Sequence, residues 1–177
     1  MLRDISLHIL DLAQNSITAG ASCIEINLSC DRESKFLTMS IKDNGCGMTA
    51  EFLASVEDPF TTSRKTRKVG MGIPFFKLAC DQAGGEFSIK SVINEGTELS
   101  GSLEIDNIDR LPLGDVGDTT SFLISSAPMT RFLIKLASVN GEFEFDTDSV
   151  KEELGNVPIT EYEILQWIKD YVNENVQ

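Results

Sequence analysis

The sequence predicts an α+β fold, in which a two-layer α/β sandwich is followed by a small C-terminal α+β appendage. Three observations lead to this prediction. Apolar residues recur at three- and four-residue spacing over residues 2–19, as in an amphipathic helix. They alternate with polar residues over residues 22–30 and 36–43, as in half-buried strands. Pro112 and Gly114 then mark a boundary. We therefore expect a mixed sheet with helices on one face, and then the appendage.

The remaining elements follow from the same periodicities and from turn residues. Before the boundary we expect a short helix over 49–56, a basic loop over 57–70, a helix over 72–83, a strand around 87–89 and a long strand over 97–105. After it we expect a weak helix over 116–126, a hairpin of 131–139 with 142–145 around Asn140-Gly141, and a helix over 160–172. The chain is thus expected to divide into residues 1–108 and residues 112–177.

Charge is distributed unevenly along the 177 residues. The net charge is −13, and residues 106–177 alone hold 14 acids and 5 bases. Such an acidic chain argues against the phosphate backbone of a nucleic acid as the main partner. Four bases nevertheless fall close together in the first part, namely Arg64, Lys65, Arg67 and Lys68. This cluster indicates either a local anion-binding segment or a solvated loop.

Cysteine and histidine usage excludes some further classes. The four cysteines form no C-x-x-C pair and the chain has one histidine, so a zinc site of these residues is not expected. Most of the cysteines lie in apolar or turn contexts, which is typical of small buried hydrophobic residues in a reducing compartment. No apolar run approaches the length of a membrane span. We therefore expect a cytoplasmic protein.

Polar residues line one side of the first predicted helix. Asp4, His8, Asp11 and Asn15 are separated by 4, 3 and 4 residues, which places them on one face. Taken alone, this face can be the solvated side of the helix. His8 is the only candidate for a phosphoacceptor histidine, and a supporting or surface role is the alternative.

Asp43 stands at an unusual place in the second predicted strand. The alternation of Leu37, Met39 and Ile41 continues to Asp43, which puts its carboxylate on the inward face just before a glycine-rich turn. A buried carboxylate requires a partner. Asp43 can alternatively begin an Asx turn, but the inward register favours a pocket.

The order of several short motifs is more specific than any one of them. The chain contains, in sequence, Asp11-x-x-x-Asn15, Asp43-x-Gly45-x-Gly47, Asp58-Pro-Phe60 before the basic loop, Gly70-x-Gly72, and Gly96-Thr97. This set resembles the GHKL family of ATP-binding domains, which groups DNA gyrase, a class of heat-shock chaperones, histidine kinases and MutL. The resemblance covers about residues 1–105. It implies the Bergerat, or histidine kinase-like ATPase, fold and binding of ATP with Mg²⁺.

The resemblance also assigns roles to particular residues. Asp43 would accept from the exocyclic amine of adenine, and the Thr97 hydroxyl would support the same contact directly or through water. Asn15 would be the magnesium ligand, since Mg²⁺ needs few protein ligands beside phosphates and water. Gly45 and Gly47 would allow close approach of the backbone to the base, and Met48 and Ile73 would pack on it. The phosphates would be bound by the start of the helix and by the basic loop, which are Gly70, Met71 and Gly72 with Arg64 and Lys65.

Asp11 departs from the family pattern. Many members have a Glu four residues before the Asn, and that Glu acts as a general base. The Asp side chain is one methylene shorter, and a misplacement of about 1 Å costs about 100-fold in rate. ATP binding is therefore better supported than turnover, and Asp11 is the candidate catalytic residue.

Three functions remain open at this point. The first is a signalling protein that phosphorylates a partner protein, as anti-sigma-factor kinases of this family do. The others are a slow ATPase switch and a non-catalytic nucleotide-sensing subunit. A partner protein is expected, with the acidic C-terminal region as one docking surface, while no nucleic acid and no membrane is expected. Oligomerisation stays open.

Overall fold

The computed structural model describes residues 2–31, 33, 35–56, 71–138 and 141–176. Its elements are helix α1 (Ile5–Thr18), strands β1 (Cys23–Asp31) and β2 (Phe36–Asp43), helices α2 (Ala50–Val56) and α3 (Gly72–Gln82), strands β3 (Phe87–Val92) and β4 (Gly96–Glu104), helix α4 (Val116–Ser126), strands β5 (Arg131–Ser138) and β6 (Gly141–Asp146), and helices α5 (Thr147–Leu154) and α6 (Tyr162–Val176).

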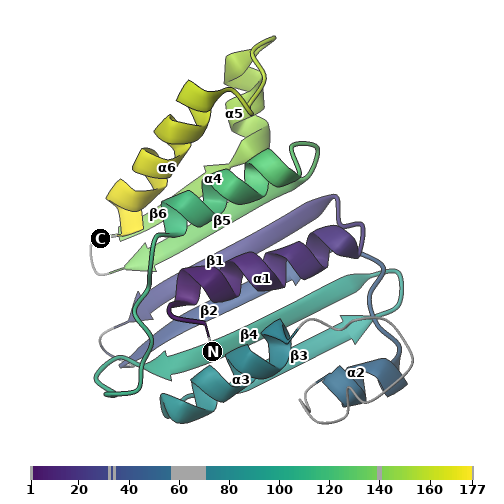
Figure 1. Cartoon of the computed structure of the whole chain (residues 1–177), viewed down its shortest axis with the longest axis vertical. Coiled ribbons are helices and arrows are strands. Elements are labelled where there is room, and N and C mark those ends of the chain that lie inside the picture. Colours follow the sequence, from purple (N-terminus) through teal and green to yellow (C-terminus); the bar gives the residue numbers. More distant parts are fainter. Residues whose placement is uncertain (1, 32, 34, 57–70, 139–140, 177) are drawn as a thin grey trace.

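The strands form one mixed sheet in the order β3-β4-β2-β1-β5-β6 (Figure 1). β1 and β5 run parallel, and every other neighbouring pair is antiparallel. The predicted α+β fold with a mixed sheet is confirmed. Both predicted segments contribute to this sheet, since residues 112–177 supply β5 and β6.

Helices α1, α3 and α4 lie on the same face of the sheet, and α6 lies beside α4 (Figure 1). The strands show why this face is covered. In β2 the side chains of Leu37, Met39 and Ile41 are buried, whereas Thr38 and Lys42, at alternating positions of the strand, are exposed. The apolar face therefore packs against the helices, and polar side chains occupy the opposite face.

Two helix predictions are corrected. The first helix begins at Ile5 rather than residue 2, because the Asp4 carboxylate accepts from the Leu7 backbone N–H at 2.9 Å and caps it. Helix α5 was not expected. It is capped by Asp146, which accepts from the N–H of Asp148 at 3.0 Å, and it ends before Gly155 at φ +59°.

Within the described ranges, no helix has both the length and the apolar character that a membrane span requires.

Candidate functional site

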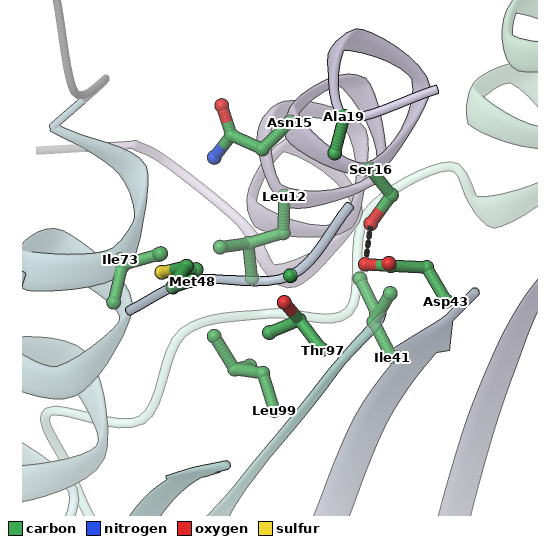
Figure 2. Close-up of a pocket in the computed structure, with 11 residues that line it drawn as sticks. Leu12, Asn15, Ser16, Ala19, Ile41, Asp43, Met48, Ile73, Thr97 and Leu99 are labelled. Carbon is green, nitrogen blue, oxygen red and sulfur yellow. Dashed lines mark hydrogen bonds between the residues drawn. The ribbon is translucent and has the colours of Figure 1, made fainter. Parts of the chain in front are cut away.

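A cavity of about 70 Å³ lies between α1, the end of β2, the start of β4 and the start of α3 (Figure 2). A site that encloses a whole small-molecule ligand usually measures about 300–1,000 Å³. This cavity therefore accommodates part of a ligand, such as one flat ring. Six residues that the sequence singled out line it together: Asn15, Asp43, Gly47, Met48, Ile73 and Thr97.

Asp43 is buried at the end of β2, as the strand register predicts. One carboxylate oxygen accepts from the Ser16 hydroxyl at 2.6 Å, and the other accepts from the Gly45 backbone N–H at 2.9 Å. Both donors hold the carboxylate in place and compensate for its burial. The carboxylate retains further lone pairs, so it can also accept from a ligand.

Thr97 is the second residue of β4 and lies directly opposite Ser91 of β3. The Ser91 hydroxyl donates to the Gly96 carbonyl at 3.0 Å, accepts from the Met48 N–H at 2.8 Å, and lies 2.8 Å from the Thr97 hydroxyl. Because a hydroxyl has one proton to give, Thr97 is the donor in the last contact. The lone pairs of the Thr97 oxygen are then available as an acceptor.

Two glycines are required by close backbone contacts at the cavity. Gly47 has φ +65°, and a Cβ there would collide with the carbonyl of Val92. Gly96 has φ +118°, and a Cβ there would collide with the carbonyl of Asp43. Any other residue would be strained at both positions. The glycines thus allow the turn after Asp43 to approach both the end of β3 and the start of β4.

Asn15 lies on α1 and is half-buried at the cavity. In Figure 2, Met48 and Ile73 lie on the left of the view, Asp43 lies on the right, and Thr97 lies between them. Sequence reasoning missed further lining residues, of which Ser16 is polar. The sequence indicates these residues only through their neighbours. Ser16 follows Asn15 on the buried side of α1, and the others belong to the apolar rows of α1, β2 and β4. These others are Leu12, Ala19, Ile41 and Leu99.

Asp11 does not line this cavity. It lies against Gly72 at the start of α3, where a Cβ on Gly72 would collide with the Asp11 carboxylate. The first N–H groups of a helix are unpaired and favour an anion. The carboxylate of Asp11 therefore stands at the helix end at which the sequence predicts phosphate.

The other predicted contacts of this end are only partly described. Met71 occupies the N-cap position of α3 and is exposed. The predicted residues Arg64, Lys65 and Gly70 lie outside the described residues, as do Asp58, Phe60, Arg67 and Lys68.

His8 is fully buried. The prediction that it lies on the surface is therefore wrong. Its ring lies 5.5 Å from that of Phe76 on α3, and neither ring nitrogen has a hydrogen-bond partner among the described residues. Burial lowers the pKa of His8 from 6.5 to about 4, although Asp4 acts in the opposite direction. His8 is thus a neutral residue of the α1–α3 interface at physiological pH.

Comparison with known proteins decides the family. Residues 3–107 match the family of histidine kinase-, DNA gyrase B- and HSP90-like ATPases. The chain belongs to this family. It is therefore a GHKL-type ATP-binding domain protein, and the predicted resemblance is confirmed.

Individual relatives agree with this assignment. The chain is 29% identical over 97 residues to sporulation kinase D of Bacillus subtilis, and 31% identical over 78 residues to sensor protein SrrB of Staphylococcus aureus. These matches cover 55% and 41% of this chain, but only 19% and 13% of the relatives. The ATPase domain of Aquifex aeolicus MutL, solved with ADP, has the same fold, with a TM-score of 0.53, 16% identity, and coverage of 87% of this chain and 68% of that one.

Proposed function

We propose that this GHKL protein binds ATP with Mg²⁺ at the cavity and acts in signalling by phosphotransfer to a partner protein. The observation that carries the binding step is the set of oxygens in the cavity. Asp43 and Thr97 both offer acceptors there, and the exocyclic amine of adenine is a donor. Guanine has an acceptor oxygen where adenine has this amine. The acceptors of Asp43 and Thr97 therefore disfavour guanine.

Asn15 fits the proposed metal site. Its amide oxygen is a ligand type that Mg²⁺ takes, and Mg²⁺ obtains its other ligands from phosphates and water. The described residues contain no group of three or more His, Cys, Asp or Glu side chains placed for a metal ion, so the metal would depend on the nucleotide. Bound Mg²⁺ would neutralise phosphate charge, while Asn15 would hold it beside α1.

Asp11 would be the general base in a phosphotransfer reaction. Its position against Gly72 brings its carboxylate to the start of α3, one helical turn from Asn15. If Asp11 instead serves only to anchor α3, the protein would be a nucleotide-sensing subunit. A slow ATPase switch is the third possible function. For each of the three functions we propose a cytoplasmic location.

Calorimetric titration with ATP, with and without Mg²⁺, tests the binding step. We expect ATP to bind, GTP to bind at least about tenfold more weakly, and Asp43→Asn to weaken ATP binding by about tenfold or more, because a charged hydrogen-bond acceptor is lost. Unchanged affinity in a folded Asp43→Asn variant would show that the site is elsewhere.

Incubation with γ-labelled ATP, alone and with cell lysate, separates the three functions. Label on a partner protein supports phosphotransfer, released phosphate supports an ATPase, and neither product supports nucleotide sensing. Asp11→Asn should abolish either reaction but retain ATP binding, if Asp11 is the base.

A further inference from the structure

Strand β6 is the last strand of the sheet order, so β5 is its only strand neighbour within the described residues. Every second residue of such a strand directs its main-chain N–H and C=O away from the neighbour. An edge of this kind is a template on which an extended segment of another chain can add a strand. β6 has 6 residues, Gly141–Asp146, so a partner segment of about the same length can pair along it.

A concave surface adjoins this edge on the helix side of the sheet, and we call it the apolar groove. Its volume is about 430 Å³. Val150 and Leu154 of α5 and Ile164 and Trp167 of α6 line it, and none of these four side chains is fully buried. Figure 1 shows α5 and α6 continuing past β6, away from the rest of the sheet. The groove therefore lies where a strand added to β6 would place its helix-side side chains.

The main chain of β6 faces the groove. Glu144, Phe145 and Asp146 line it, but the side chains of Glu144 and Asp146 alternate with that of buried Phe145 and point to the opposite face of the sheet. On that face Asp146 pairs with Arg131 of β5 at 2.6 Å. Glu144 and Asp146 therefore contribute main-chain atoms to the groove, which sets hydrogen-bonding groups beside its apolar walls.

On the face away from the helices, β6 carries two exposed glutamates. Glu142 and Glu144 form no ion pair in the part of the chain that the structure describes. Lys135 lies opposite Glu144, but it pairs with Glu25 of β1 at 3.2 Å. A depression of about 470 Å³ adjoins both glutamates, and Ala137 also lines it. This face therefore has room for long basic side chains on a neighbouring strand.

From these two faces, we infer that β6 binds an extended segment of a partner protein as an additional strand, and that this segment alternates apolar with basic residues. Its apolar side chains would enter the apolar groove, because the side chains of a strand alternate between the two faces. Its lysine or arginine side chains would lie beside Glu142 and Glu144, since opposite charges on neighbouring strands attract. Main-chain hydrogen bonds would supply affinity, and the two faces would select the sequence.

A second copy of this chain fits the edge poorly. Residues opposite each other on neighbouring strands point to the same face, so antiparallel pairing of two β6 strands would set Glu142 and Glu144 against the same carboxylates of the other copy. Like charges in this position are destabilising. The glutamates thus oppose self-association through β6 and favour a basic partner strand. Their charge also opposes nucleic acid and anionic membranes as occupants.

The probe is the peptide acetyl-Ile-Lys-Val-Lys-Ile amide, titrated into the full chain without nucleotide. Trp167, the only tryptophan, reports binding by fluorescence, and amide hydrogen exchange reports on β6. We expect saturable binding and slower exchange over residues 141–146, because outward N–H groups become hydrogen-bonded. A peptide with glutamate in place of lysine should bind about tenfold more weakly. One with serine in place of isoleucine and valine should show no saturable binding, because the groove then stays unfilled.

Variants test the selection by charge. Glu142→Lys/Glu144→Lys should reverse the preference, so that the glutamate peptide binds about tenfold more tightly than the lysine peptide. Glu86→Lys/Glu98→Lys changes the net charge equally at two exposed positions, one just before β3 and one in β4, at the other end of the strand order. This control should keep the preference for the lysine peptide. Circular dichroism checks that each variant is folded.

Four results would overturn the inference. They are no saturable binding of the lysine peptide, binding without slower exchange over β6, the same charge preference in both double variants, and a dimer of the free chain in which exchange over β6 is slowed. Nucleotide is absent throughout, so failure here leaves the ATP-binding proposal unaffected, and failure of ATP binding leaves this inference unaffected.

Discussion

Single hydroxyl groups set the hydrogen-bonding character of the cavity at which we propose that ATP binds. Ser16 donates to Asp43, and Thr97 donates to Ser91, so the oxygens of Asp43 and Thr97 keep lone pairs for a ligand. Each of these protons is directed by a neighbour on a different element. The selectivity of the cavity therefore depends on residues that need not touch the ligand.

Removal of the Ser16 hydroxyl tests its part in this arrangement. We expect Ser16→Ala to weaken ATP binding by about tenfold, because a hydrogen bond to a charged group contributes about 1.5–3 kcal/mol and Asp43 would lose one of its two donors. Isothermal titration calorimetry measures the change. Thr18→Ala is the matched control, since within the described part of the chain the exposed Thr18 hydroxyl bonds only to the Gln14 carbonyl of the same helix. Equal affinities of Ser16→Ala and the unmodified chain would contradict this positioning role.

Removal of the Ser91 hydroxyl should affect selectivity more than affinity. Without Ser91 as its acceptor, the Thr97 proton can turn towards the cavity and donate to the oxygen of guanine. In Ser91→Ala we therefore expect the preference for ATP over GTP to fall by about tenfold, consistent with one hydrogen bond. Competition between the two nucleotides measures the ratio. Ser88→Ala, an exposed change in the same strand, should keep the full preference for ATP. If Ser91→Ala also keeps this preference, Ser91 does not direct the Thr97 proton.

Part of the site was predictable because it follows from local periodicity. The inward position of Asp43 comes from strand alternation, and Asn15 comes from helical spacing. Ser16 and Ser91 were not predictable in this way. Their partners depend on how α1 lies over β2 and on the β3–β4 register, which places Ser91 opposite Thr97. Such contacts are set by tertiary packing, which neighbouring residues in one sequence do not specify.

Among the elements, the same distinction applies to α5. The long periodic helices and strands were predicted, because each shows several turns or alternations. α5 has eight residues and few apolar ones, and its signals were only a capping Asp146 and a terminal Gly155. Its place is fixed by Thr147, which is fully buried and accepts from the Phe132 N–H of β5 at 2.9 Å.

The interface of α1 and α3 makes stability depend on pH. His8 is buried there with a pKa of about 4, against 6.5 in the unfolded chain, so the unfolded state binds more protons between these values. Stability contributed by the neutral ring is present above pH 6.5 and is lost as the pH falls towards 4. The loss amounts to about 2 kcal/mol at pH 5.

Urea unfolding at pH 7.5 and pH 5 measures this loss, and His8→Leu isolates it. The variant removes the titrating ring and keeps an apolar side chain against Phe76. We expect its stability to change less between the two pH values than that of the unmodified chain, by about 2 kcal/mol. Carboxylates held at low pKa, such as Asp146 beside Arg131, contribute equally to both proteins. The same pH dependence in both would show that the ring is already protonated in the native state or is accessible to water.

At the scale of the whole molecule, the sheet joins the segment that matches the ATPase family to the acidic C-terminal segment. β1 is bonded to β2 on one side and to β5 on the other. Its buried residues Ile24 and Ile26 stand beside Phe132 and Ile134 of β5, all of which are at most 1% exposed. Loss of β5 would uncover these side chains and leave the backbone groups of β1 as an open edge.

We therefore expect the chain to unfold as one unit, although its sequence motifs end near residue 105. Scanning calorimetry of the full chain should show a single transition with equal calorimetric and van't Hoff enthalpies. The fragment of residues 1–108 should melt at a much lower temperature or aggregate, because it exposes a long apolar edge strand. A shorter fragment, residues 1–173, retains every strand and should melt in a single transition. Two transitions in the full chain, or a fragment of residues 1–108 as stable as the full chain, would instead establish two independent domains.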